Sequence, residues 1–64
     1  MKVYVMTKAK PFNEEIFVDI KATRKEAESE FKKKFPHMRV DKATGDMASD
    51  KEITWLLFIH EKTI

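Results

Sequence analysis

Apolar and polar residues alternate near the start of the chain, which is the pattern of a β-strand. The segment KVYVMTKA at residues 2–9 sets Val3 and Val5 on one face and Tyr4 and Met6 on the other. The alternation predicts a strand that begins almost at the first residue.

A second segment, EEIFVDIK at residues 14–21, alternates in the same way and sets Ile16, Val18 and Ile20 on one face. The KPFN segment between the two contains a proline and an asparagine, residues that favour turn dihedrals. We therefore expect the two strands to form an antiparallel hairpin.

The pattern changes to a helical one in TRKEAESEFKKKFP, residues 23–36. Thr23 with Glu26 three positions later is a capping box, a signature of a helix N-terminus. A proline does not continue a helix easily, so the helix should end near Phe35. Apolar residues recur every four positions and form one stripe for the core: Ala27, Phe31 and Phe35.

The rest of the chain contains one clear strand and one ambiguous segment. The run ITWLLFIH predicts a final strand from Ile53 to about Glu61, with apolar residues on both faces. Residues 38–51 fit either a short irregular edge strand with TGD as a turn or a surface loop. We favour the edge strand.

These elements predict an α+β fold in a single domain, residues 1–64, with the order ββα(β)β. One helix packs on one face of a mostly antiparallel sheet of three or four strands, whose order the pattern leaves open. The residues expected beneath the helix share one face of the predicted strands: Val3, Val5, Ile16, Val18, Ile20, Ile53, Trp55, Leu57 and Ile59.

The opposite, helix-free face is expected to carry a second apolar set, mixed with polar residues. Small monomers seldom leave such a patch open, and exposed patches often mark protein contacts. The alternative is that the segment from Met38 to Glu52 covers it. The residues predicted for this partner-binding face are Tyr4, Met6, Phe17, Leu56, Phe58 and His60.

Composition narrows the class of protein. A chain of 64 residues buries only about 60% of its unfolded surface, so packing or oligomerisation must stabilise it. It has no cysteine, which excludes disulfides and thiolate-bound metals. The apolar N-terminal run is too short for a signal peptide or a membrane span, so we expect a cytoplasmic protein with no membrane partner.

The histidine, serine and acidic residues do not form any recognisable catalytic or ligand-binding motif. We therefore expect no catalytic, metal or cofactor site. Neither His37 nor His60 has a second ligand at metal-binding spacing. The run DKATGDMASD lacks the ligand order of a calcium loop. Ser29 and Ser49 have no base in a recognisable pattern, and one glycine cannot form a glycine-rich phosphate loop. Trp55 is expected in the core.

The sequence thus predicts a non-catalytic binding or adaptor module that acts through its helix-free sheet face, with a second copy or another protein as partner. The alternative is single-stranded nucleic acid, whose bases stack on aromatic residues bordered by lysines. Glu15 and Asp19 on the same predicted face oppose this alternative, since they repel phosphates. The residues for base stacking and phosphate contact would be Tyr4, Phe17, Phe58, Lys2, Lys8 and Lys21.

Overall fold

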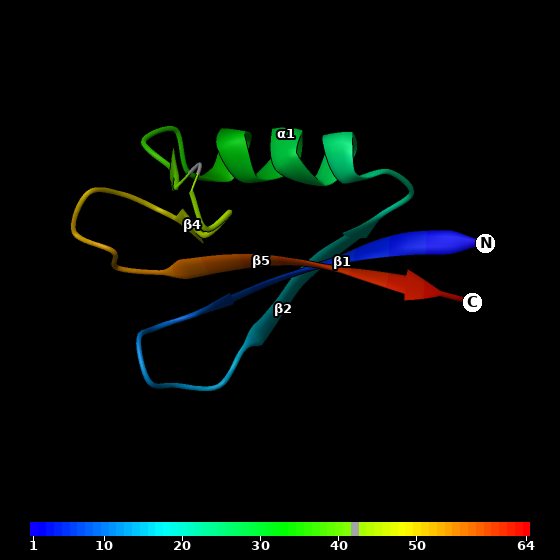
Figure 1. The fold of residues 1–64 in the computed structure, drawn as a ribbon, viewed down its shortest axis with the longest axis horizontal. Helices are drawn as coiled ribbons and strands as arrows, with labels where there is room; N and C mark the ends of the chain where they lie inside the picture. The colour runs from blue at the N-terminus through cyan, green and yellow to red at the C-terminus, as the bar shows by residue number, and fades with distance from the viewer. Residues whose placement is uncertain (42) are drawn as a thin grey trace.

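The computed structural model describes residues 1–41 and 43–64. It has one helix packed on a five-stranded antiparallel sheet, so the predicted α+β class is confirmed, although the sheet has more strands than expected. The sheet order is β2-β1-β5-β4-β3, and α1 lies along one side of it (Figure 1). The elements are β1 Lys2–Ala9, β2 Ile16–Lys21, α1 Arg24–Lys34, β3 Arg39–Val40, β4 Met47–Ala48 and β5 Leu56–Thr63.

The predicted β1–β2 hairpin is present, and its turn falls at KPFN. The backbone N–H of Asn13 donates to the carbonyl of Lys10 at 3.0 Å, which closes the turn. A β-bulge interrupts the pairing: Met6 pairs with Asp19, but Thr7 pairs with Phe17, so Val18 is an extra residue in β2. A bulge of this kind changes which face the following side chains occupy.

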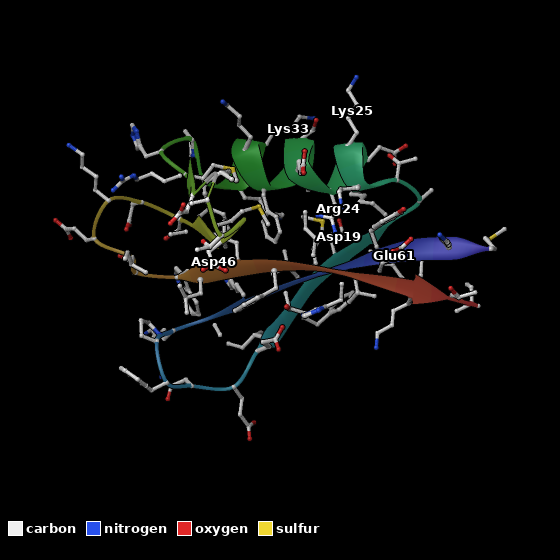
Figure 2. The ribbon with its side chains drawn as sticks, in the orientation of Figure 1. Asp19, Arg24, Lys25, Lys33, Asp46 and Glu61 are labelled. Atoms are coloured by element: carbon white, nitrogen blue, oxygen red, sulfur yellow. The ribbon has the colours of Figure 1, made fainter. Side chains whose placement is uncertain are left out.

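The helix begins and ends as the sequence predicts. The Thr23 hydroxyl accepts a hydrogen bond from the backbone N–H of Glu26 at 3.1 Å, so Thr23 is the N-cap. At the other end the N–H of Phe35 donates to the carbonyl of Phe31 at 2.7 Å. Lys25 projects from the outer side of α1, away from the sheet (Figure 2).

The ambiguous segment forms two short strands, β3 and β4, so the expected edge strand is confirmed and a second strand was missed. The turn between them contains Gly45, whose φ of 79° is one that glycine adopts without steric strain. The N–H of Asp41 donates to the carbonyl of Asp46 at 2.8 Å, across the hairpin. Two-residue strands give too little alternation to be recognised from sequence.

The final strand starts three residues later than predicted because residues 50–54 form a turn. The Asp50 carboxylate accepts hydrogen bonds from the N–H and the hydroxyl of Thr54, at 3.1 and 2.9 Å. Ile53 adopts a positive φ of 54°, which is outside strand geometry. β5 then runs to Thr63, two residues beyond the predicted end.

The core lies between α1 and one face of the sheet. Phe31 and Met6 are fully buried, with exposed fractions of 0%. In an antiparallel sheet, directly paired residues lie on the same face, and Met6 pairs with Ile59. The helix therefore covers the face that contains Met6. The core cluster consists of Met6, Ala27, Phe31, Met47 and Leu57, with Tyr4, Val18, Phe35, Met38, Trp55 and Ile59 packed against it.

This placement corrects the predicted core. Four predicted core residues lie on the helix side as expected: Val18, Trp55, Leu57 and Ile59. Val3 and Val5 do not, because β1 directs Tyr4 and Met6 toward the helix instead. Both faces of β1 are apolar, so its alternation alone cannot decide which face is buried.

Three further residues that the sequence predicted for the core lie outside it. The bulge in β2 places Ile20 with Val5 on the side away from the helix. Ile16 and Ile53 are about half exposed, at 52% and 47%.

We predict that Phe31→Ala lowers the free energy of unfolding by about 3–5 kcal/mol, as truncation of a fully buried phenylalanine does. Phe31 is the middle residue of the apolar stripe Ala27, Phe31 and Phe35 and is completely buried. Chemical denaturation followed by far-ultraviolet circular dichroism measures the change. The exposed Lys25→Ala variant is the control, and equal effects of both variants would show that α1 does not dock through Phe31.

Candidate interaction surface

The side of the sheet opposite α1, which we call the helix-free face, is formed by β2, β1 and β5. Its membership follows from the strand pairing: Val5 pairs with both Ile20 and His60, and Thr7 pairs with both Phe17 and Phe58. Its apolar residues are Val3, Val5, Phe17, Ile20, Leu56 and Phe58, and its polar residues are Thr7, Glu15, His60 and Lys62.

No helix lies across this face in the described part of the chain (Figure 1). Phe17 and Ile20 are 63% and 47% exposed, respectively. The segment that would screen the face under the alternative interpretation extends the sheet as β3 and β4, and Met38 and Met47 pack toward the helix. The helix-free face is therefore exposed along β2 and partly exposed along β1 and β5, except at Ala9, which pairs with Leu56 and is buried.

Four of the six residues predicted for the partner-binding face lie together on the helix-free face: Phe17, Leu56, Phe58 and His60. Tyr4 and Met6 do not, since both pack in the core beneath α1. This part of the prediction was wrong because β1 presents its other side to the helix. The helix-free face instead contains Val3, Val5 and Ile20, which the sequence analysis had assigned to the core.

A polar network crosses the middle of this face. Glu15, from the loop before β2, accepts a hydrogen bond from the Thr7 hydroxyl at 2.6 Å, and the same oxygen contacts Nε2 of His60. The hydrogen bonds from Thr7 and then His60 lower the pKa of the Glu15 carboxyl. The His60 ring stacks on Phe58, with ring centres 5.9 Å apart. Glu15 thus remains a carboxylate in the middle of apolar side chains.

The lysines expected at the border of this face lie on the helix side instead. Lys8 is over the rings of Trp55 and Phe35, at 4.5 and 5.9 Å from their centres. Lys2 contacts Glu61 at 3.1 Å, and that carboxylate raises the pKa of Lys2. Glu61 pairs with Tyr4 on the helix side. The lysine border predicted for this face is therefore absent. The strand pairing instead places Lys62 and Arg39 on it, toward its two ends.

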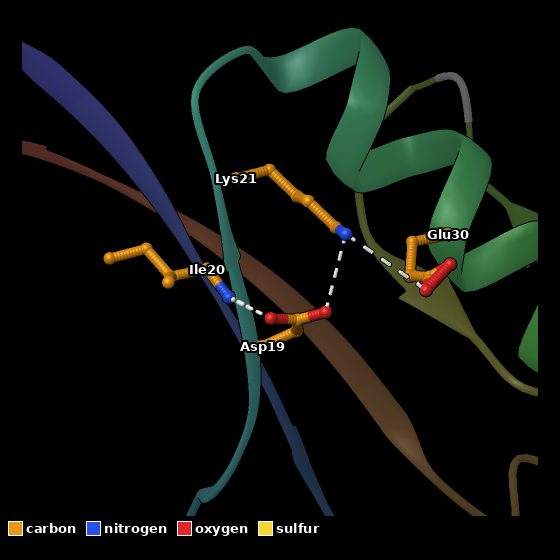
Figure 3. A network of polar contacts seen from close by, with 4 residues as sticks. All are labelled: Asp19, Ile20, Lys21 and Glu30. Carbon is orange, nitrogen blue, oxygen red and sulfur yellow. Dashed lines mark hydrogen bonds and ion pairs between the residues drawn. The ribbon is translucent and has the colours of Figure 1, made fainter.

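The outer edge of β2 is protected by a second polar network, drawn in Figure 3. The Asp19 carboxylate accepts a hydrogen bond from the backbone N–H of Ile20 at 2.7 Å and contacts the Lys21 ammonium at 3.3 Å. Lys21 also reaches Glu30 on α1, at 4.0 Å. The N–H of Ile20 and then the side chain of Lys21 lower the pKa of Asp19. The carboxylate occupies a donor that an added strand would need.

The other residues weighed as chemical sites have structural roles or are exposed. The buried Ser49 hydroxyl accepts a hydrogen bond from the N–H of Trp55 at 3.1 Å. Hydrogen bonds from Thr54 lower the pKa of Asp50. His37 is exposed. Within residues 1–41 and 43–64, no three His, Cys, Asp or Glu side chains gather closely enough to hold a metal ion.

Comparisons with protein-family models, curated proteins and solved structures found no match for this chain. Among the described residues, α1 is too short to cross a membrane, and no other helix is present. The functional argument therefore depends on the helix-free face itself.

We predict that Asp19→Ala promotes edge-to-edge association, because it frees the N–H of Ile20 on an edge strand and removes a charge from that edge. Light scattering over a concentration series should show species larger than those of the unsubstituted chain. Asp19→Asn is the matched control, since its side-chain oxygen can still accept from Ile20. If Asp19→Ala has the same size distribution as the unsubstituted chain, Asp19 does not protect the edge.

We also predict that dialysis against EDTA leaves the far-ultraviolet circular dichroism and the melting temperature unchanged. The described carboxylates near the turns accept hydrogen bonds from their own loops, as Asp50 does from Thr54. A loss of helical signal that calcium or zinc restored would contradict this expectation.

Proposed function

We propose that this chain is a non-catalytic protein-binding module that acts through the helix-free face, and that the partner seated there is a second copy of the chain. The observation that carries the proposal is the apolar surface shared by three strands and left uncovered by α1. Two sheets that pack face to face bury such surfaces between them, about 10 Å apart.

The exposed area supports a second copy as the occupant. The chain exposes 4925 Å², whereas a compact monomer of 7.6 kDa is expected to expose about 4,300 Å². The difference of about 600 Å² approaches the roughly 800 Å² that each partner buries in an interface of standard size. An interface of standard size on the helix-free face would bury an area of this order.

The small core supports self-association independently. Of the residues that the structure describes, only six apolar ones are buried, and two of these are alanines. The composition provides no disulfide that could compensate. A dimer stabilises each folded copy because only the folded chain presents the interface. A reducing, cytoplasmic environment is in keeping with the cysteine-free composition.

Nucleic acid is the weaker alternative. Base stacking on Phe17 and Phe58 would lack the three lysines predicted to contact phosphates, since Lys2, Lys8 and Lys21 lie on the other side of the sheet. Of the lysines named here, Lys62 alone shares the face with these rings. The Glu15 carboxylate contacts Thr7, which pairs with both Phe17 and Phe58, and would repel phosphates.

We predict that Phe58→Glu weakens self-association by at least about thirtyfold, which corresponds to about 2 kcal/mol for loss of a central interface residue. In a symmetric dimer the substitution occurs twice in one interface. Sedimentation equilibrium over a concentration series measures the dissociation constant, and far-ultraviolet circular dichroism verifies that the variant is folded.

A second pair of variants addresses the same interface with less risk to the fold. Phe17→Ser removes an exposed ring from the helix-free face, and Phe12→Ser removes a fully exposed ring from the β1–β2 loop. Only Phe17→Ser should weaken association. A chain that stays monomeric at about 1 mM would overturn the proposal. Salt-sensitive binding of single-stranded oligonucleotides, lost in Phe58→Glu, would support the nucleic-acid alternative instead.

A further inference from the structure

The network of Thr7, Glu15 and His60 lies in the part of the helix-free face that a second copy would cover. It joins three regions of the chain, because Thr7 is on β1, Glu15 precedes β2, and His60 is on β5. The side chains of Glu15 and His60 are 44% and 43% exposed, respectively, so water still reaches both in the single chain. A docked copy would remove that water.

Removal of water from an ionised carboxylate is costly unless a positive charge compensates it. The Thr7 hydroxyl supplies a hydrogen bond but no charge. The ring of His60 is the titratable group in contact with Glu15, and when protonated it makes the pair neutral overall. Desolvation of the pair is then less costly than desolvation of a lone carboxylate.

The neighbouring residues of β1 and β2 do not supply a positive charge to Glu15 in place of His60. β1 presents Val3, Val5 and Thr7 to the helix-free face, and β2 presents Phe17 and Ile20, none of which is charged at neutral pH. On β5 the remaining charged group of this face is Lys62, which pairs with Val3, while His60 pairs with Val5. The contacts described for the Glu15 carboxylate are with Thr7 and His60, so His60 is the group placed to compensate its charge.

We propose that self-association through the helix-free face is controlled by pH, with His60 taking up a proton as the two faces close over Glu15. This inference rests on the proposed function, since it concerns the same surface. Association is then stronger at about pH 6 than at about pH 8, because a histidine side chain ordinarily gains its proton near pH 6.5.

The direction of the pH effect on association follows from proton linkage. If the associated state binds more protons than the separate chains, lowering the pH favours association, by up to about tenfold per pH unit for each proton taken up. A symmetric dimer contains two such pairs. We expect the dissociation constant to fall at least about tenfold between pH 8 and pH 6 at constant ionic strength.

Sedimentation equilibrium at about pH 6, 7 and 8 tests this expectation with four chains: unsubstituted, His60→Gln, Glu15→Gln and His37→Gln. His37 is the matched control, because it is exposed beyond the end of α1. The pH dependence should be lost in His60→Gln and retained in His37→Gln. Glu15→Gln should associate at pH 8 at least as tightly as the unsubstituted chain and lose the gain in acid, because no carboxylate is left to be neutralised.

The possible outcomes separate the two proposals. Tighter association in acid that depends on His60 supports the pH control. Association that is independent of pH, or whose pH dependence persists in His60→Gln, overturns the pH control and leaves the proposed interface standing. No association of the unsubstituted chain or of Glu15→Gln at any of these pH values overturns both.

Discussion

The pairing of β1 with β5 is the interaction on which the rest of this structure depends. It joins the two ends of the chain over eight residue pairs, from Lys2 with Thr63 to Ala9 with Leu56. All other strands attach to this pair, β2 on one side and the short strands β4 and β3 on the other. Its register also decides which side chains share a face, because directly paired residues point to the same side.

This register places Met6 beside Ile59 under the helix and Thr7 beside Phe58 on the open side. Both sides of the central pair are apolar, but residues 1–41 and 43–64 contain one short helix to cover them. The helix covers one side with Ala27 and Phe31. The other side of the central pair has no covering helix among the described residues.

The two polar networks lie on different surfaces of the sheet, one at the edge formed by β2 and the other on the helix-free face. At the edge, Asp19 occupies the N–H of Ile20 and is held by Lys21. On the helix-free face, Glu15 is tied to Thr7 and His60. A carboxylate at an exposed edge prevents strand addition at little cost, since it stays in water. A carboxylate under a docked face needs a compensating charge, which is why we propose that association through that face is coupled to proton uptake.

The sequence alone was sufficient to predict the longer strands and the helix. Alternation predicted β1, β2 and most of β5, the Thr23 cap marked the start of α1, and the stripe through Phe31 identified the buried side of the helix. It also predicted a sheet with apolar residues on both sides, and it placed Phe17, Phe58 and His60 on the open one. These features depend on neighbours close in the chain, which a residue pattern records directly.

Only the tertiary structure decided which side of β1 the helix covers. Val3 and Val5 alternate with Tyr4 and Met6, so either set could be buried, and the pairing with β5 chose the second. The bulge at Val18 then moved Ile20 to the open face. The contact of Glu15 with His60 joins residues 45 positions apart. Strand register, a bulge and a long-range contact all depend on the partner strand, and an alternating pattern within one strand carries no information about its partner.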